Sequence, residues 1–200
     1  MKVLVACECS NTVRDAFLRL GHDAYSCDLQ RADHPNKNWR RHIRGDVRPL
    51  LREKWDLVIA HPPCTYLCNS GVRWMKENDD RYRMMLEGAR FFIDCLLANA
   101  PMVAVENPIH HKYARELIPP YDQIIHPWQY GHREQKQTCL WLRGLPCLQG
   151  TNDVSEEMSI MPANMRCRIH YLSGKNRAKQ RSKTFFGIAR AMAEQWGCLK

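Results

Sequence analysis

The sequence predicts an α/β protein that has a mostly parallel sheet with helices on both faces. Short apolar runs suited to buried strands alternate with longer segments whose apolar residues recur at helical spacing. Polar residues directly follow several of these apolar runs. The chain has 200 residues, enough to bury one core without disulfides or metals. We therefore expect residues 1–200 to form a single domain.

The first half of the chain is expected to alternate between strand and helix. Strands are expected at Val3–Ala6, Ala24–Cys27, near His42–Val47 and at Trp55–Ala60, and a helix with Val13, Ala16, Phe17 and Leu20 on one face is expected after the first strand. Gly21 fits the C-terminal cap of that helix, because glycine adopts the left-handed conformation without strain.

The second half is expected to contain two longer helices and three strands. The expected helices are Asp79–Ala98, with Tyr82, Met85, Leu86, Ala89, Ile93 and Leu96 on one face, and Thr184–Trp196, with Phe185, Ile188, Ala189, Met192 and Trp196 on one side. The expected strands are Met102–Val105, Gln123–Ile125 and Thr138–Leu142. Residues 143–183 are expected to be an irregular basic segment.

Composition and charge restrict the classes of partner. The hydrophobic share of 44% and charged share of 26% are those of a soluble globular protein, and no run approaches the roughly 20 apolar residues that span a membrane. The apolar start MKVLVA meets Glu8 too early for a signal peptide, so we expect a cytoplasmic protein with no membrane partner. The net charge of +9 favours a nucleic acid, although a solvated basic surface would give the same number.

The basic residues form two clusters. No acidic residue occurs from Met158 to Ala193. The clusters are Arg166, Arg168, Lys175, Arg177, Lys179, Arg181, Lys183 and Arg190, and Arg31, Lys37, Arg40, Arg41, Arg44, Arg48 and Arg52. The ten cysteines should be reduced thiols, and their spacing contains no paired C-x-x-C arrangement of a structural zinc site. We therefore predict no metal.

Five chemically active side chains stand at or just past the ends of predicted strands: Glu8, Asp28, Asp46, Cys64 and Glu106. In an open α/β sheet, ligands bind at the carboxyl ends of the strands. Taken singly, each has a simpler explanation: a buried cysteine, a helix-capping acid for Glu106, and turn residues for the two aspartates. Their shared location instead favours a functional site.

An ordered set of motifs resembles the DNA cytosine-5 methyltransferases, and especially small phage-encoded members. The motifs are His61-Pro62-Pro63-Cys64 after one strand, Val105-Glu106-Asn107 after the next, Gly45-Asp46-Val47, Asp28, and the closing run from Phe186 to Ala193. The resemblance covers about residues 3–142 and 176–197. It implies a Rossmann-like methyltransferase fold that uses S-adenosylmethionine, in the cytoplasm of a bacterial host if the chain is phage-encoded.

The resemblance also implies roles for individual residues. Cys64 would attack carbon 6 of cytosine as a thiolate, and its ordinary pKa of about 8.5 should be lowered for this task. Glu106 would protonate or hydrogen-bond ring nitrogen 3, a base such as water would remove the proton on carbon 5, and Lys136 stands where the family has an arginine. The implied cofactor contacts are Ala6, Glu8, Ser10, Asn11, Asp28, Leu29, Asp46, Val47, His61 and Pro62.

The chain departs from the family pattern in two further places. The loop after the first strand lacks the usual glycines, although Asn11 tolerates positive φ and Ser10 or Asn11 can cap the next helix. The interval from Leu142 to Arg177 is also too short for a recognition domain. Candidate nucleic-acid contacts are Arg73, Arg166, Arg177, Lys179 and Arg181.

These departures leave several functions open. The substrate is expected to be DNA with little sequence preference or with targeting by a partner, or alternatively a free cytosine nucleotide. A catalytically silent DNA-binding protein is the alternative of another class, supported by the missing glycines. Methylation of an exocyclic amine ranks low because His61 and Cys64 occupy places where that chemistry has other residues.

Overall fold

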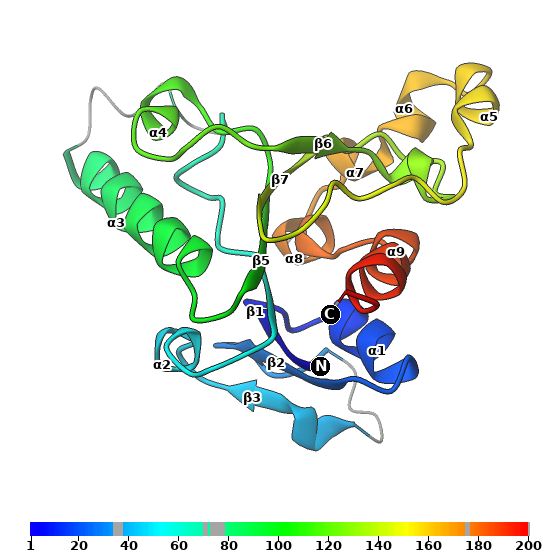
Figure 1. The fold of residues 1–200 in the computed structure, drawn as a ribbon. Helices are drawn as coiled ribbons and strands as arrows, with labels where there is room; N and C mark the ends of the chain where they lie inside the picture. The colour runs from blue at the N-terminus through cyan, green and yellow to red at the C-terminus, as the bar shows by residue number, and fades with distance from the viewer. Residues whose placement is uncertain (34–37, 70–71, 73–78, 175–176, 200) are drawn as a thin grey trace.

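A computed structural model describes residues 1–33, 38–69, 72, 79–174 and 177–199 (Figure 1). Among these residues, seven strands form one sheet in the order β3-β2-β1-β4-β5-β7-β6. The strands are β1 Lys2–Ala6, β2 Asp23–Asp28, β3 His42–Arg44, β4 Leu57–Ala60, β5 Met102–Asn107, β6 Gln123–Ile125 and β7 Thr138–Arg143. β1 to β5 pair in parallel, whereas β7 runs antiparallel to both β5 and β6. The expected mostly parallel α/β sheet is therefore confirmed.

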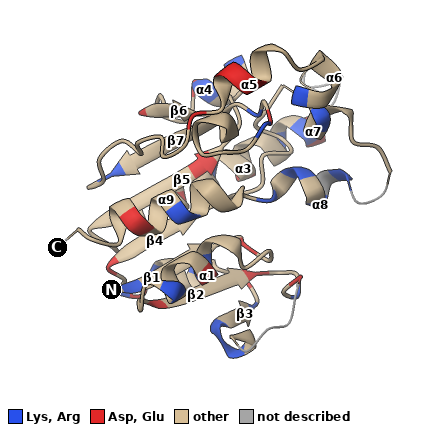
Figure 2. Ribbon diagram, turned by 90° about the vertical axis from the view of Figure 1, so that its right-hand side faces the viewer, with Lys and Arg blue, Asp and Glu red and all other residues tan. Residues whose placement is uncertain are grey.

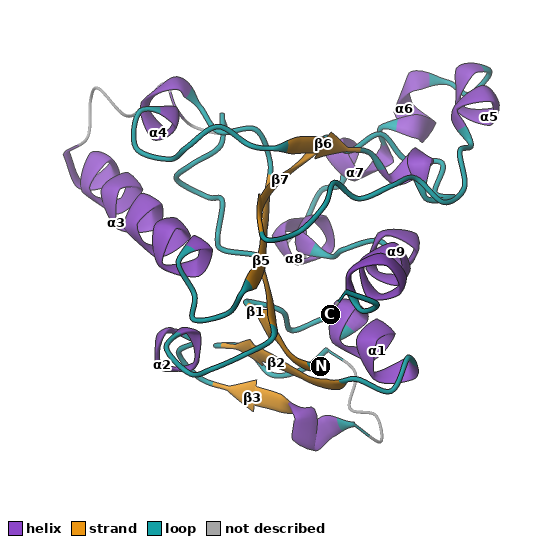
Figure 3. Cartoon of the chain, in the orientation of Figure 1, coloured by secondary structure: helices purple, strands orange, loops and turns teal. Residues whose placement is uncertain are grey.

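Helices cover both faces of the sheet, as Figure 3 shows. The helices α1 Thr12–Arg19 and α9 Phe186–Trp196 pack together on one face. The opposite face carries α2 Arg48–Leu51, α3 Asp79–Leu96 and α4 Lys112–Arg115. Two 3-10 turns, η1 Trp39–Arg41 and η3 Pro127–Gln129, lie in the connections. This arrangement is the α/β class expected from the sequence, with helices on both faces of a mostly parallel sheet.

The first strand shows how the two faces arise from alternation. Val3 and Val5 belong to the core beneath α1 and α9, while Leu4 and Ala6 belong to the core beneath α3. Successive side chains of a strand point to opposite faces, and a sheet covered on both sides buries them all. Each of these four residues is fully buried. The strand therefore reads in the sequence as a continuous apolar run, with no alternation of apolar and polar residues.

Three expected boundaries or faces differ from the structure. The buried stripe of α3 is Met85, Ala89, Phe92 and Cys95, so Phe92 rather than Ile93 points fully inward. On this rotation of the helix, Tyr82 is 47% exposed. β3 ends at Arg44, and Val47 instead packs into the core directly before α2. The last helix begins at Phe186, two residues later than expected, with Phe185 in the extended N-cap conformation.

The segment 143–183, expected to be irregular, contains short helices. These are α5 Ser155–Ser159, α6 Ala163–Arg166, α7 Arg168–Tyr171 and α8 Arg177–Ser182. The side chain of Glu134 fastens α7 to the loop before β7, since its carboxylate accepts the backbone N–H of Ile169 at 2.8 Å and lies 3.4 Å from Arg168. Within the described residues, no helix is both long and apolar enough to cross a membrane.

Candidate active site at the carboxyl edge of the sheet

The loop that follows β4 meets the end of β5 at the edge of the sheet. These strands are parallel neighbours in which Ala60 pairs with Val105, so His61, directly after β4, lies beside Glu106 of β5. Nδ1 of His61 lies 3.0 Å from Oε2 of Glu106. Asn107 donates a hydrogen bond from Nδ2 to the carbonyl of Pro62 at 2.8 Å, which fixes the loop that carries Cys64.

The His61–Glu106 contact joins two opposite charges in a buried place. The side chains of the two residues are only 11% and 12% exposed. Burial alone would lower the pKa of His61, but the contact and the charges of Glu106 and Glu8 raise it above its ordinary value. Burial alone would raise the pKa of Glu106, but His61 holds it well below the usual range, with smaller contributions from Lys136 and Thr184. The contact therefore favours the charged forms of both groups, an imidazolium beside a carboxylate.

Cys64 lies in a tight turn rather than in an electropositive pocket. Its carbonyl accepts the backbone N–H groups of Leu67 and Cys68, both at 3.0 Å, so the two cysteine side chains fall on the same side of one helical turn. A hydrogen bond with Cys68 and partial burial raise the pKa of Cys64 far above its ordinary value. This is the opposite of the lowered pKa expected from the sequence. The thiol of Cys64 is half-buried.

Two further polar side chains approach this site from distant parts of the chain. Lys136 is half-buried, and its positive charge favours the ionised forms of both Glu106 and Cys64. Thr184, directly before α9, donates a hydrogen bond from its hydroxyl to Oε2 of Glu106 at 3.3 Å. Sequence reasoning missed Thr184, because no local motif connects it with a residue 78 positions earlier.

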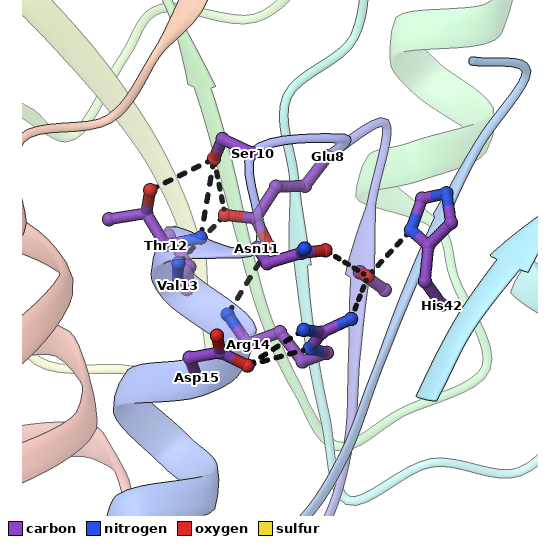
Figure 4. Close-up of polar contacts among 9 residues, drawn as sticks. Glu8, Ser10, Asn11, Thr12, Val13, Arg14, Asp15 and His42 are labelled. Carbon is purple, nitrogen blue, oxygen red and sulfur yellow. Dashed lines mark hydrogen bonds and ion pairs between the residues drawn. The ribbon is translucent and has the colours of Figure 1, made fainter. Parts of the chain in front are cut away.

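The loop between β1 and α1 forms a closed polar network around Glu8 (Figure 4). The Glu8 carboxylate accepts the backbone N–H groups of Val13 at 2.7 Å and Arg14 at 3.2 Å, and the hydroxyl of Ser10 at 3.0 Å. Glu8 therefore caps α1 together with Ser10, whose hydroxyl accepts the N–H of Thr12 at 3.3 Å as the sequence suggested. Asn11 has φ of 65° with no side-chain cap, and Cys7 also has positive φ. Cys7 and Asn11 thus adopt the left-handed backbone conformation that glycine usually takes.

The same network continues beneath α1 (Figure 4). Arg14 is fully buried, contacts Asp15 at 2.8 Å and donates to the hydroxyl of Ser26 at 3.3 Å. That hydroxyl also contacts Nδ1 of His42 at 2.9 Å. The network joins β1, β2 and β3, so the loop after β1 is held rigidly against its neighbours.

Asp28 and Asp46, at the ends of β2 and β3, both hold local turns. Asp28 accepts the backbone N–H of Gln30 at 2.8 Å, and Asp46 accepts that of Arg48 at 3.0 Å. The bond from the Arg48 backbone, aided by its guanidinium, lowers the pKa of Asp46. Leu29 is 72% exposed beside Asp28. Ala6 and Pro62 are buried, and the carbonyl of Ala6 accepts the N–H of His61 at 2.9 Å.

The basic segment folds back toward the loop that follows β2. Lys179 and Lys183 both pair with Asp33, the latter at 2.7 Å, although the Asp33 side chain is only 3% exposed. Burial alone would raise the pKa of Asp33, but hydrogen bonds from the two lysines lower it below its ordinary range. Lys179 is thus engaged in an ion pair within the protein although its side chain is 43% exposed, while Arg177 and Arg181 lie on the same helix, α8, shown with its basic residues in Figure 2. Arg166 is half-buried on α6. Arg73 lies outside the described residues.

No group of three or more His, Cys, Asp or Glu that could hold a metal ion occurs among the described residues. No protein-family model matches the chain, and no curated protein matches it. Among solved structures, one similar chain is described as a candidate DNA modification methyltransferase encoded within a prophage (E. coli). It is 16% identical with a TM-score of 0.43, and the match covers 70% of this chain and 45% of that one. The chain thus spans under half the length of that protein.

Proposed function

We propose that this protein transfers a methyl group from S-adenosylmethionine to carbon 5 of cytosine in DNA, with Cys64 as the nucleophile. The observation that carries the proposal is the meeting of the loop after β4 with the end of β5, with the His61–Glu106 contact at 3.0 Å and the Asn107–Pro62 bond at 2.8 Å. A nucleophile and an acid that act on one small ring have to lie close together, as residues at the same end of neighbouring parallel strands do. Cys64 and Glu106 satisfy this requirement.

The residues at the ends of β1 and β2 fit S-adenosylmethionine. Asp28 uses Oδ1 for its turn, which leaves the second carboxylate oxygen for ribose hydroxyls, and exposed Leu29 offers an apolar surface for a purine. Glu8 is a weaker candidate contact than the sequence suggested, because α1 already uses its carboxylate. When bound, the cofactor would supply an electrophilic methyl group on a sulfonium.

The chain's own residues would perform the remaining chemistry. Cys64 loses its proton to a base such as water and its sulfur forms a bond to carbon 6, while Glu106 supplies hydrogen bonding or a proton at nitrogen 3. Lys136 stabilises the thiolate through its charge. After methyl transfer, loss of the carbon-5 proton to a base reforms the ring double bond and expels Cys64. Entry of a base into this site from duplex DNA requires flipping.

The proposal is tested by incubation with labelled S-adenosylmethionine and either DNA or deoxycytidine nucleotides, followed by mass analysis of the nucleosides. We expect 5-methyl-deoxycytidine from DNA. Binding of DNA should weaken steeply with salt, whereas binding of a single nucleotide should weaken little. Methylated product from nucleotides alone would move the substrate assignment to the free nucleotide. No methylated product from either substrate would contradict the proposed activity.

A catalytically silent DNA-binding protein is the second candidate. The observation that favours it is the hydrogen-bonded, protonated Cys64. This candidate predicts DNA binding with neither cofactor binding nor product. Calorimetry with S-adenosylmethionine in the presence of DNA separates the two candidates.

A further inference from the structure

We propose that His61 is the proton reservoir of Glu106, so that the two side chains hold one shared proton that is delivered to the target ring. The inference rests on the proposed function, because it specifies where the acid of that reaction obtains its proton. His61 stands at the third position before Cys64, and its ring is held against Glu106 by the pairing of β4 with β5. Its role is that of a positioning residue, since it acts through Glu106.

The resting state of Glu106 creates the need for such a reservoir. An acid that protonates nitrogen 3 must carry a proton at the start of the step, whereas Glu106 is a carboxylate at neutral pH. The neighbouring imidazolium holds the proton that Glu106 lacks, 3.0 Å away. Transfer of that proton from Nδ1 to Oε2 converts the charged pair into a neutral imidazole and a carboxylic acid.

The proton then has a short path to the substrate. Both described contacts of Glu106, from His61 and from Thr184, use Oε2. The last torsion of a glutamate side chain is broad and nearly two-fold, so rotation of the carboxyl group presents the protonated oxygen to the ring. Nitrogen 3 gains the proton as Cys64 adds to carbon 6. The proton returns through Glu106 to His61 when Cys64 leaves, so the cycle is balanced.

Charged and polar groups from several elements lie around the His61–Glu106 pair. Glu106 on β5 and Glu8 after β1 favour the charged imidazole, whereas Lys136 before β7 opposes it. Thr184 donates to the carboxylate and is neutral. Among the described residues, neither ring nitrogen of His61 has a partner in hydrogen-bond geometry, although the ring is only 11% exposed and Nδ1 lies 3.0 Å from Oε2 of Glu106. A buried imidazole with one ionic contact and no second partner is suited to exchanging a proton rather than to holding a fold.

The pair itself can be tested without any activity, by following the ring resonances of His61 by NMR as the pH is changed. The pKa of His61 should lie above the ordinary value of about 6.5 in the native protein. In Glu106→Gln, which keeps the shape but removes the charge, it should fall by at least one pH unit. An unchanged pKa of His61 in Glu106→Gln would overturn the pairing on which the inference stands.

The role in the reaction is tested by the ratio of single-turnover methylation rates of the native protein and His61→Asn across pH. Asn keeps a donor near the place of Nδ1 but cannot hold the proton. The ratio should be near one at low pH, where Glu106 carries a proton in both proteins, and should rise with pH through the range in which only the native pair holds a proton. Titration of Cys64 affects both proteins equally and cancels in the ratio.

A purely structural role for His61 would give a ratio that does not change with pH, and this outcome would overturn the inference. His22→Asn, in the turn between α1 and β2, is the matched control and should give a ratio near one throughout. Failure of the proposed function is distinct, since the native protein would then form no methylated cytosine at any pH.

Discussion

At the scale of single residues, the site is built from groups whose resting protonation opposes the reaction. Glu106 is ionised although the reaction needs an acid, and Cys64 is protonated although the reaction needs a thiolate. In both cases the cause is one neighbouring side chain: His61 for Glu106, and Cys68 for Cys64. A bound substrate that displaces or recruits these partners would therefore control the onset of chemistry. The effect of each partner on the pKa of its neighbour can be tested by substituting that partner alone.

The effect of Cys68 on Cys64 is open to direct measurement. Cys68→Ala removes the hydrogen bond that raises the pKa of Cys64 most, so the thiol should ionise at lower pH. The alkylation rate of Cys64 by iodoacetamide, followed against pH by peptide mass analysis, should show its midpoint at least one pH unit lower. Cys147→Ala, at an exposed position, is the control. A midpoint that stays in place would mean that burial alone raises the pKa.

At the scale of elements, ion pairs hold α8 against the loop that follows β2. Lys179 and Lys183 lie 40% or more exposed, yet both reach the nearly buried Asp33. The amide of Asp33 also donates to the carbonyl of Cys9 at 2.8 Å, so the loops after β1 and β2 and helix α8 meet at one carboxylate. Arg31, a member of the other basic cluster, lies two residues before this carboxylate.

The fastening of α8 predicts a change in protease sensitivity. Asp33→Asn keeps the side-chain shape but removes the charge that holds both lysines, so α8 should loosen. Trypsin should then cleave after Lys179, Arg181 or Lys183 several-fold faster than in the native protein. About 0.5 M salt should accelerate cleavage of the native protein less than the substitution does, because a buried carboxylate is screened weakly. Asp153→Asn, at an exposed turn before α5, should leave cleavage unchanged.

Elements and contacts differed in how far the sequence could predict them. The main strands were predictable because they are short apolar runs such as Leu57–Ala60, and Cys64 and Glu106 were proposed as site residues because one lies shortly after such a run and the other at the end of one. The partners of these residues were not predictable. Thr184, Asp33 and the capping role of Glu8 depend on which loops the strand order brings together, and no local pattern records that order.

At the scale of the whole molecule, helix α9 closes one face of the sheet by a very close approach. The amide of Gly187 donates to Nε2 of His132 at 2.8 Å, which holds the start of α9 against the loop after η3. A Cβ at Gly187 would lie 2.0 Å from the carbonyl oxygen of Tyr130 and 2.9 Å from the His132 ring. Thr184, which contacts Glu106, comes three residues earlier. The packing of α9 therefore also positions the site.

Gly187→Ala tests this link between the last helix and the fold. Backbone cannot give way as a flexible side chain can, so the free energy of unfolding should fall by about 1–3 kcal/mol or more. Urea unfolding followed by circular dichroism measures the loss. Gly45→Ala is the matched control, because nothing lies within 4 Å of a Cβ there and its stability should change by well under 1 kcal/mol. Equal stability of both variants would contradict the close approach.

The central claim, that Cys64 is the nucleophile toward cytosine, is tested most directly by DNA that carries 5-fluorocytosine. Attack on carbon 6 followed by methyl transfer leaves fluorine where a proton would be removed, so the adduct cannot resolve. In the presence of S-adenosylmethionine, we predict a covalent protein–DNA complex that survives denaturation and maps to Cys64 by peptide mass analysis. Cys64→Ser should abolish it, and Cys68→Ser should not. An adduct on Cys68, or methylated product from Cys64→Ser, would contradict the account.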